Sequence, residues 1–228
     1  MLRLMQITWH PALLLLGAVM ASIPTAPSAP LIETDEVKVV RALEKSQVVG
    51  KFHQHDRNRV MVYLQPGRQR FEYQDGRQPA VFDWKAGQVV WSPAGGMHSP
   101  QVLDHDFDII EIELKTPGIG TATGKAIGGN LDPLKVDPAH YKLEFENPQV
   151  RVLRVRIEPH GVAAMHAHST DRVTIFLTDQ NFQTKDSAGK VATVQHKAGD
   201  VAWGTPIEHT EQNLSDEPFE AVSVELKK

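Results

Sequence analysis

The 228-residue sequence contains no cysteine. A disulfide framework and a lipid anchor on cysteine are therefore excluded. The sequence also lacks a glycine-rich phosphate loop, a Ser-His-Asp set and zinc-finger spacing, and no stretch reads as a reliable amphipathic helix. Any chemistry must come from other side chains, and the 11 histidines are the first group to consider.

Excess positive charge is missing as well. Lysine and arginine number 24 against 28 aspartate and glutamate residues, a formal net charge of −4. The sequence therefore has no excess of positive charge for binding nucleic acid and no polybasic stretch for binding anionic lipid. A small-molecule ligand is the expected partner, with no nucleic acid and no membrane contact beyond the leader described next.

The N-terminus has the order of a secretory signal. Arg3 precedes an apolar run at residues 11–21, and small residues follow it. The run is short for a bilayer span, so we expect a signal peptide over residues 1–21, cleaved before Ser22. An uncleaved anchor is the alternative. The mature chain would be secreted or periplasmic, with a net charge of −5, because Arg3 is the only charged residue removed.

The rest of the sequence repeats itself. HQHDRNRVMVYL at residues 53–64 aligns with HAHSTDRVTIFL at 166–177, an offset of 113 residues. KAGQVVW and KAGDVAW, and FDIIEIELK and FEAVSVELK, align at an offset of 112. A nearly constant offset over separate landmarks indicates a duplication.

Each copy consists of short runs rich in β-branched and aromatic residues, bounded by turn formers such as Pro66-Gly67 and Asp75-Gly76. The prediction is all-β, with two tandem double-sheet jelly-roll barrels. The expected divisions are a flexible leader (22–34), an N-terminal domain (35–115), a linker rich in Gly, Thr and Pro (116–139) and a C-terminal domain (140–228).

The motifs in each copy resemble those of the cupin superfamily, and the whole mature chain resembles a bicupin. The first cupin motif carries His-x-His, present twice here. The second has glycine, five residues, Pro-x-Gly, two residues and histidine, which GQVVWSPAGGMH at 87–98 satisfies. GDVAWGTPIEH at 199–209 fits more loosely, with its proline at Pro206, and Asn213 follows four residues after His209.

The resemblance implies a double-stranded β-helix that brings three histidines together in each copy. Three neutral imidazoles are a reasonable ligand set for Fe, Mn, Zn, Ni or Cu. The implied metal ligands are His53, His55 and His98 in the first copy, and His166, His168 and His209 in the second. Because the Pro-x-Gly turn is intact only in the first copy, we expect that copy to be the better metal site.

Both copies depart from the family at the position of its glutamate ligand, where Arg59 and Arg172 stand. A guanidinium cannot ligate a metal. An inward-pointing arginine could bind an acidic substrate beside a three-histidine metal. Alternatively, each arginine could turn to solvent or pair with a neighbouring aspartate, Asp56 or Asp171. A third alternative is a metal-free site in which arginine and histidines bind a ligand directly.

Two classes of function follow. One is an exported, metal-dependent cupin enzyme, an oxygenase, isomerase or decarboxylase acting on a small organic molecule, an acidic one if an inward arginine binds it. The other is a metal-free ligand-binding or structural cupin without catalysis. No acid–base carboxylate is evident on the expected site face, since Glu208 next to His209 should face the opposite way. His105, His140, His160 and His196 have no partner at ligand spacing and are expected on the surface or in loops.

Overall fold

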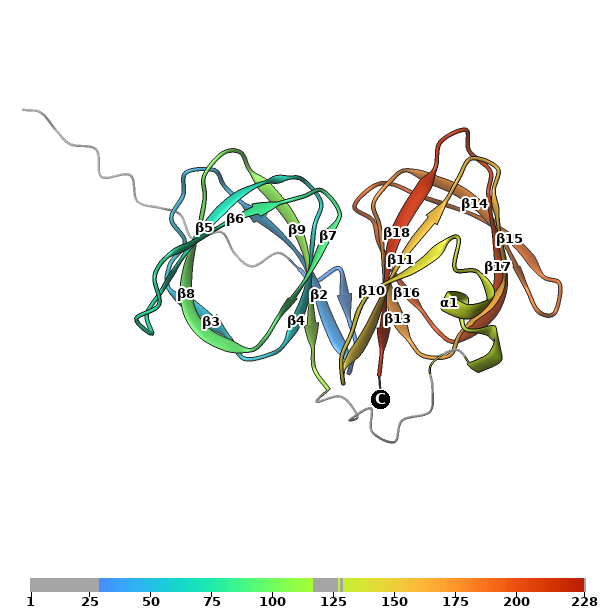
Figure 1. Cartoon of the computed structure of the whole chain (residues 1–228), viewed down its shortest axis with the longest axis horizontal. Coiled ribbons are helices and arrows are strands. Elements are labelled where there is room, and N and C mark those ends of the chain that lie inside the picture. Colours follow the sequence, from blue (N-terminus) through green and yellow to red (C-terminus); the bar gives the residue numbers. More distant parts are fainter. Residues whose placement is uncertain (1–28, 117–126, 128, 228) are drawn as a thin grey trace, which may run out of the picture.

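The computed structural model describes residues 29–116, 127 and 129–227. The expected signal peptide and its cleavage site lie outside the described residues, as do most of the leader and part of the linker. The described chain forms two β-barrels that lie side by side (Figure 1). The all-β prediction of two jelly-roll barrels is confirmed.

Each barrel is built from two antiparallel sheets with the same strand order. In the first barrel the order is β1-β2-β9-β4-β7 in the five-stranded sheet and β3-β8-β5-β6 in the four-stranded sheet. Its strands are β1 (Ile32–Glu33), β2 (Val37–Glu44), β3 (His53–His55), β4 (Arg59–Tyr63), β5 (Gly67–Tyr73), β6 (Ala80–Trp84), β7 (Gln88–Ser92), β8 (Gly95–Val102) and β9 (Phe107–Leu114).

The second barrel repeats this arrangement as β10-β11-β18-β13-β16 and β12-β17-β14-β15. Its strands are β10 (Tyr141–Glu146), β11 (Val150–Ile157), β12 (Val162–His168), β13 (Arg172–Phe176), β14 (Gln180–Asp186), β15 (Val191–His196), β16 (Val201–Gly204), β17 (Ile207–Asn213) and β18 (Phe219–Leu226).

A 3₁₀ turn, η1 (Gly129–Leu131), and a one-turn helix, α1 (Pro133–Val136), precede the second barrel. The Asp132 side chain caps α1 by accepting a hydrogen bond from the Leu134 amide (3.1 Å) and also pairs with Arg151 of β11 (2.9 Å). The last residues of the expected linker are therefore attached to the second barrel. None of the helices in the described part of the chain has the length and apolarity needed to cross a membrane.

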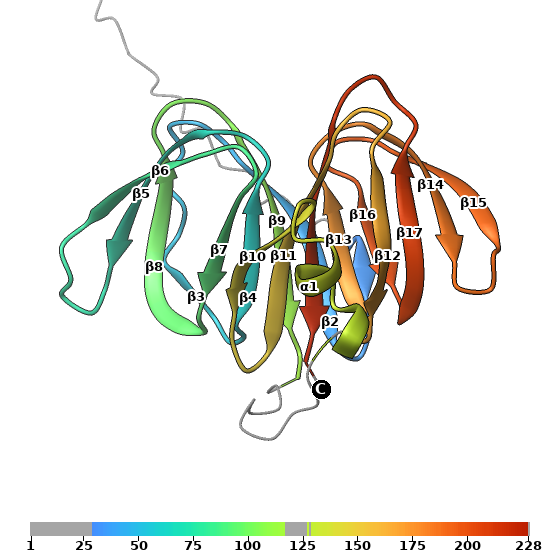
Figure 2. The ribbon, with the colours of Figure 1, turned by 45° about the vertical axis from the view of Figure 1, so that its right-hand side comes forward.

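The two five-stranded sheets pack against each other at the centre of the molecule (Figure 2). Every residue of β4 is buried, because one of its faces meets the other barrel and the other lines its own barrel. Val60 and Val62 belong to the cluster between the barrels, whereas Met61 and Tyr63 belong to the first barrel's interior. Strand alternation therefore directs Arg59 into that interior.

The contact between the barrels has an approximate twofold relation. Gly87 and Gly199 both have positive φ, 72° and 87°. A Cβ on Gly87 would lie 3.1 Å from an Arg154 guanidinium nitrogen, and one on Gly199 would lie 3.1 Å from Arg41. Arg41 and Arg154 occupy equivalent positions in the repeat. Each arginine thus reaches the motif glycine of the opposite barrel.

Candidate metal and anion sites

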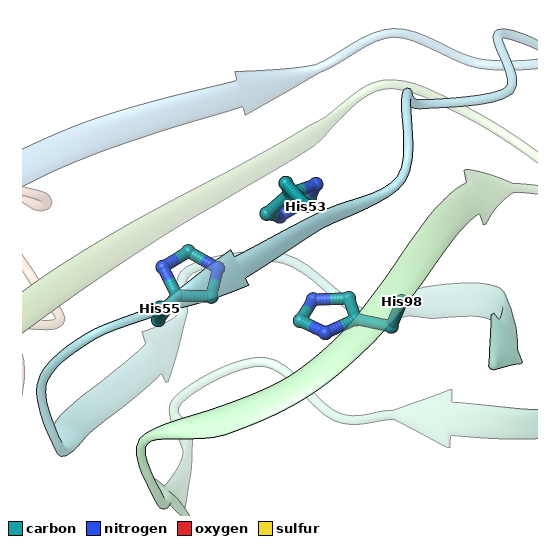
Figure 3. Close-up of side chains that lie close together, drawn as sticks. All are labelled: His53, His55 and His98. Carbon is teal, nitrogen blue, oxygen red and sulfur yellow. The ribbon is translucent and has the colours of Figure 1, made fainter. Parts of the chain in front are cut away.

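The first triad joins two neighbouring strands. His53 and His55 lie on β3, and His98 lies opposite His53 on β8 (Figure 3). Their candidate ligand atoms all lie within 4.8 Å of one another, and the three residues are half-buried. The backbone carbonyls of Lys51 and Gly96 accept hydrogen bonds from Nδ1 of His53 (2.8 Å) and of His98 (2.6 Å), which leaves Nε2 of both rings for a metal.

The second triad is assembled in the same way and is buried. His166 and His168 lie on β12, and His209 lies opposite His166 on β17. Exposure is 0% for His166, 4% for His168 and 3% for His209. The candidate ligand atoms again lie within 4.8 Å of one another. The structure therefore brings together each predicted set of three histidines.

Two histidines of the second triad are held in orientation through Nδ1. The Ala164 carbonyl accepts a hydrogen bond from His166 (2.7 Å), and the Glu225 carboxylate accepts one from His168 (2.7 Å). Burial alone would raise the pKa of Glu225, but the hydrogen bonds from His168 and Arg151 outweigh it and lower the pKa. A carboxylate on the distal nitrogen fixes the tautomer and the ring of a metal-binding histidine.

His209 has no such partner. Both of its ring nitrogens are buried and lack a hydrogen-bond partner among the residues that the structure describes. Burial lowers its pKa to about 4, and the neighbouring His166 and His168 contribute to the lowering. An unsatisfied buried polar atom costs about 1–3 kcal/mol. A metal ion that used one lone pair would remove part of that cost, so the donor set fits a metal.

In the first triad, burial and the charge of Arg59 lower the pKa of His55 to about 3. Burial also lowers the pKa of His98. These rings are therefore neutral at physiological pH, which metal binding requires. No carboxylate is hydrogen-bonded to either ring within the described part of this barrel, in contrast to Glu225 and His168.

Two polar residues beside the second triad were not anticipated from the sequence. The Tyr141 hydroxyl lies 2.9 Å from Nε2 of His166 and donates a hydrogen bond to Oε2 of Glu211 (2.8 Å). Burial and Glu211 raise the pKa of Tyr141, whereas His209 and His166 outweigh burial and lower the pKa of Glu211. Glu208 is exposed, as alternation from His209 predicts.

Arg59 is buried at 4% exposure. Its guanidinium donates to Glu111 (2.7 Å) and to the Ser92 hydroxyl (2.9 Å). This arrangement contradicts the alternative in which Arg59 turns to solvent or pairs with Asp56. Arg59 faces the interior, but a buried carboxylate already balances its charge.

Arg172 also faces its barrel interior, with a different partner. It donates to the Thr205 carbonyl (2.7 Å) and lies over Gly204, where a Cβ would come within 2.7 Å of its Cζ. In the part of the chain that the structure describes, no carboxylate forms an ion pair with it. Burial lowers its pKa, opposed by the more distant Glu211 and Glu225.

A cavity of about 280 Å³ opens onto the second triad. Its polar lining includes Tyr141, His168, Arg172, His209 and Glu211. The larger cavity of the first barrel, about 590 Å³, is lined by Arg59 and by His98. Of the two barrels, the second therefore combines, around one cavity, a metal-ligand set, an acid–base pair and a guanidinium that has no carboxylate partner among the described residues.

The four other histidines of the described residues are not brought to either triad. His105, His140 and His160 contact Pro66, Asp137 and Asp216, respectively. The expectation of a surface or loop position is wrong for His196, which ends β15 and stacks on Phe176 with ring centroids 3.8 Å apart. Alternation along β15 directs this ring inward.

Solved structures share this architecture. AerE from Microcystis aeruginosa matches over 84% of this chain and 88% of its own, with a TM-score of 0.59 and 11% identity. Oxalate decarboxylase from Bacillus subtilis matches over 84% of this chain and 69% of its own, with a TM-score of 0.58 and 15% identity. A cupin domain from Bordetella pertussis covers 39% of this chain and 92% of its own, at a TM-score of 0.37 and 28% identity.

Both barrels have the cupin fold. At these identities the likeness concerns the fold alone. No protein-family model and no curated protein sequence matches the chain. The cupin resemblance of the motifs is therefore supported at the level of the fold, and any evidence for an activity lies in the two sites.

Proposed function

We propose that this protein is an exported, metal-dependent bicupin enzyme whose C-terminal barrel binds a divalent transition metal and acts on a small carboxylic acid. The observation that carries the proposal is His209, with both ring nitrogens buried and no hydrogen-bond partner among the described residues. A ring in this state beside two oriented imidazoles is explained by a metal that binds its unprotonated nitrogen.

The metal is assigned to the second copy, against the expectation drawn from the Pro93-x-Gly95 turn. Burial and the Glu225–His168 hydrogen bond favour the second triad. Three imidazoles suit Fe, Mn, Zn, Ni or Cu. Oxalate decarboxylase, which shares the fold, has Mn(II) centres, and this supports Mn(II) as the first ion to test.

The substrate class is proposed from Arg172. Its guanidinium lines the 280 Å³ cavity, and among the described residues the Thr205 carbonyl is its only hydrogen-bond partner, so donors remain for a carboxylate. An arginine fork binds a carboxylate through two parallel hydrogen bonds. The apolar wall includes Val155, Phe176 and Phe219 and would exclude water from the bound acid.

When bound, the metal would polarise the substrate as a Lewis acid or activate dioxygen, the two kinds of metal chemistry expected of a cupin enzyme. Within the chain itself, Arg172 would orient the acid. Tyr141 and Glu211 share a hydrogen bond at the cavity wall and could hold or move a proton there. Burial of the whole set strengthens each of these electrostatic interactions.

Export is part of the proposal and is supported by residues 1–21 of the sequence, with Arg3 before the apolar run. Mass spectrometry of the protein from the periplasm or medium of its host should give an N-terminus at Ser22. Recovery of the full-length chain only from the cytoplasm would overturn the export proposal.

The metal proposal is tested by comparing equivalent substitutions in the two copies. His166→Ala and His53→Ala are purified from their native compartment, and bound metal is measured by elemental analysis. We expect about one ion per chain in wild type, retained in His53→Ala and lost in His166→Ala. Retention in His166→Ala with loss in His53→Ala would assign the site to the first copy. A metal-free wild type that also fails to take up Mn(II) would overturn the proposed function.

A further inference from the structure

Glu211 lies on the face of β17 that carries His209. The two residues are two apart on the strand, so their side chains point to the same side. Oε1 of Glu211 lies 4.0 Å from Nδ1 of His209, and the side chain is 16% exposed. A carboxylate therefore accompanies the second triad, on the strand of the second motif.

The position of Glu211 relative to a metal follows from His166. Because Nδ1 of His166 donates a hydrogen bond to the Ala164 carbonyl, Nε2 is the nitrogen that is left to bind a metal. The Tyr141 hydroxyl lies 2.9 Å from this Nε2 and 2.8 Å from Oε2 of Glu211. Only the hydroxyl group separates the carboxylate from the ligand nitrogen. When Nε2 binds a metal, this hydroxyl can donate its single proton to Glu211 alone.

From this geometry, and resting on the proposed metal function, we infer that Glu211 is the fourth protein ligand of the C-terminal metal. It supplies, from the second motif, the carboxylate that the first motif lacks at Arg172. The Glu211 carboxylate lies outside the cluster of the three imidazoles, so the inference requires its side chain to rotate toward them. Tyr141 then orients the carboxylate by donating to its second oxygen.

The charges around the cavity favour this arrangement. Three neutral imidazoles do not compensate the positive charge of a divalent ion, which would lie near the Arg172 guanidinium. Like charges in a buried site repel strongly. An anionic ligand on the metal offsets that repulsion. Hard and borderline divalent ions such as Mn(II) accept carboxylate oxygen readily alongside imidazole.

The first barrel provides an internal comparison. Pro100 follows His98 at the position where Glu211 follows His209, so no carboxylate is available there. The buried carboxylate near Arg59, Glu111, is engaged in a salt bridge (2.7 Å). The first triad therefore has three histidines without a fourth protein ligand from β8.

The test separates a ligand from a hydrogen-bond acceptor. The full mature chain carrying His53→Ala, which restricts binding to the second site, is stripped of metal and titrated with Mn(II) by calorimetry. Co(II) is added separately and its visible spectrum recorded, because that spectrum depends on the number and type of ligands. Glu211→Gln, Glu211→Asp and Tyr141→Phe are compared in this background, with circular dichroism as the check on folding.

We expect Glu211→Gln to weaken Mn(II) binding by at least about tenfold, or about 1.4 kcal/mol, and to change the Co(II) spectrum. Tyr141→Phe should weaken binding less than Glu211→Gln does and leave the Co(II) spectrum unchanged, and Glu211→Asp should retain part of the affinity. Equal losses in Glu211→Gln and Tyr141→Phe, or wild-type affinity and spectrum in Glu211→Gln, would overturn the inference and leave the three-histidine site intact. Absence of Mn(II) binding before any change at Glu211 would instead overturn the proposed function and the inference together.

Discussion

Replacing Arg59 by methionine should destabilise the metal-free protein strongly, because it removes one member of a buried ion pair. The Arg59 and Glu111 side chains are 5% and 12% exposed, and their charged atoms are 2.7 Å apart. Loss of one partner leaves the other charge buried, at a cost of about 3–5 kcal/mol. For a chain of this size the thermal midpoint should fall by roughly 10 °C.

The double variant Arg59→Met/Glu111→Gln should recover most of this loss, because a neutral buried pair avoids the uncompensated charge. Arg172→Met is the matched control. Its partner is a backbone carbonyl, so the loss should stay within about 1–3 kcal/mol.

Urea unfolding followed by tryptophan fluorescence gives these free energies, with thermal melting as a second measurement. A loss below about 1 kcal/mol for Arg59→Met, together with a double variant no more stable than the single one, would refute the assignment of Arg59 to structure. The same result would reopen Arg59 as an anion-binding residue of the first barrel.

Three further outcomes are expected. Arg172→Met should weaken binding of oxalate, measured by calorimetry on the Mn(II)-loaded protein, by at least about tenfold, or about 1.4 kcal/mol; an equal loss in Arg59→Met would contradict the assignment of the anion site to the second barrel. Glu225→Gln should lower Mn(II) affinity by about 10- to 100-fold, since the orientation of His168 depends on it; unchanged affinity in a dialysis assay would contradict this role. The metal-free protein should lose stability as pH falls from about 6.5 to about 4, because folding lowers the pKa of His209 to about 4 and the unfolded chain therefore binds its proton first. Protonation of His209 should account for roughly 3 kcal/mol of this loss in the free energy of unfolding. An equally steep decline in His209→Ala would show that other groups are responsible.

The fold was predictable because the sequence contains the same evidence for it twice. The motifs occur twice at nearly constant offset, and β-branched runs separated by turns predict strands in both copies. Period-two alternation also places the two histidines of each His-x-His on one face. The stretch at residues 36–46, which could be misread as helical, contains β2, and β2 pairs with β9 along its whole length.

The partners of the two arginines could not be read in the same way. Glu111 is 52 residues from Arg59, and only the register of β4 against its neighbours brings the two together. The counterpart of Glu111 in the second copy is Ser223, which lies on β18. The difference between the two arginines therefore arises from a residue on a neighbouring strand and not from the arginine strands themselves. Sequence spacing alone contains no information about that contact.

Glu211 could have been found from the sequence, since it stands two residues after His209 and alternation places both on one face. Tyr141 could not, because β10 is longer than β1 and Tyr141 lies beyond the part of the edge strand that the first barrel shares. A contact that exists in one copy only leaves no trace in an internal repeat.

The approximate twofold contact between the barrels has a consequence for how such a pair of sites can change. In a symmetric dimer of identical single barrels, every substitution appears in both halves at once, so a site cannot be altered in one half and kept in the other. Here the halves share one chain, and each meets the motif glycine of the other through its own arginine, Arg41 or Arg154. Position 111 can therefore hold glutamate while position 223 holds serine. Covalent joining permits one barrel to use its inward arginine for stability while the other leaves its own available to a ligand.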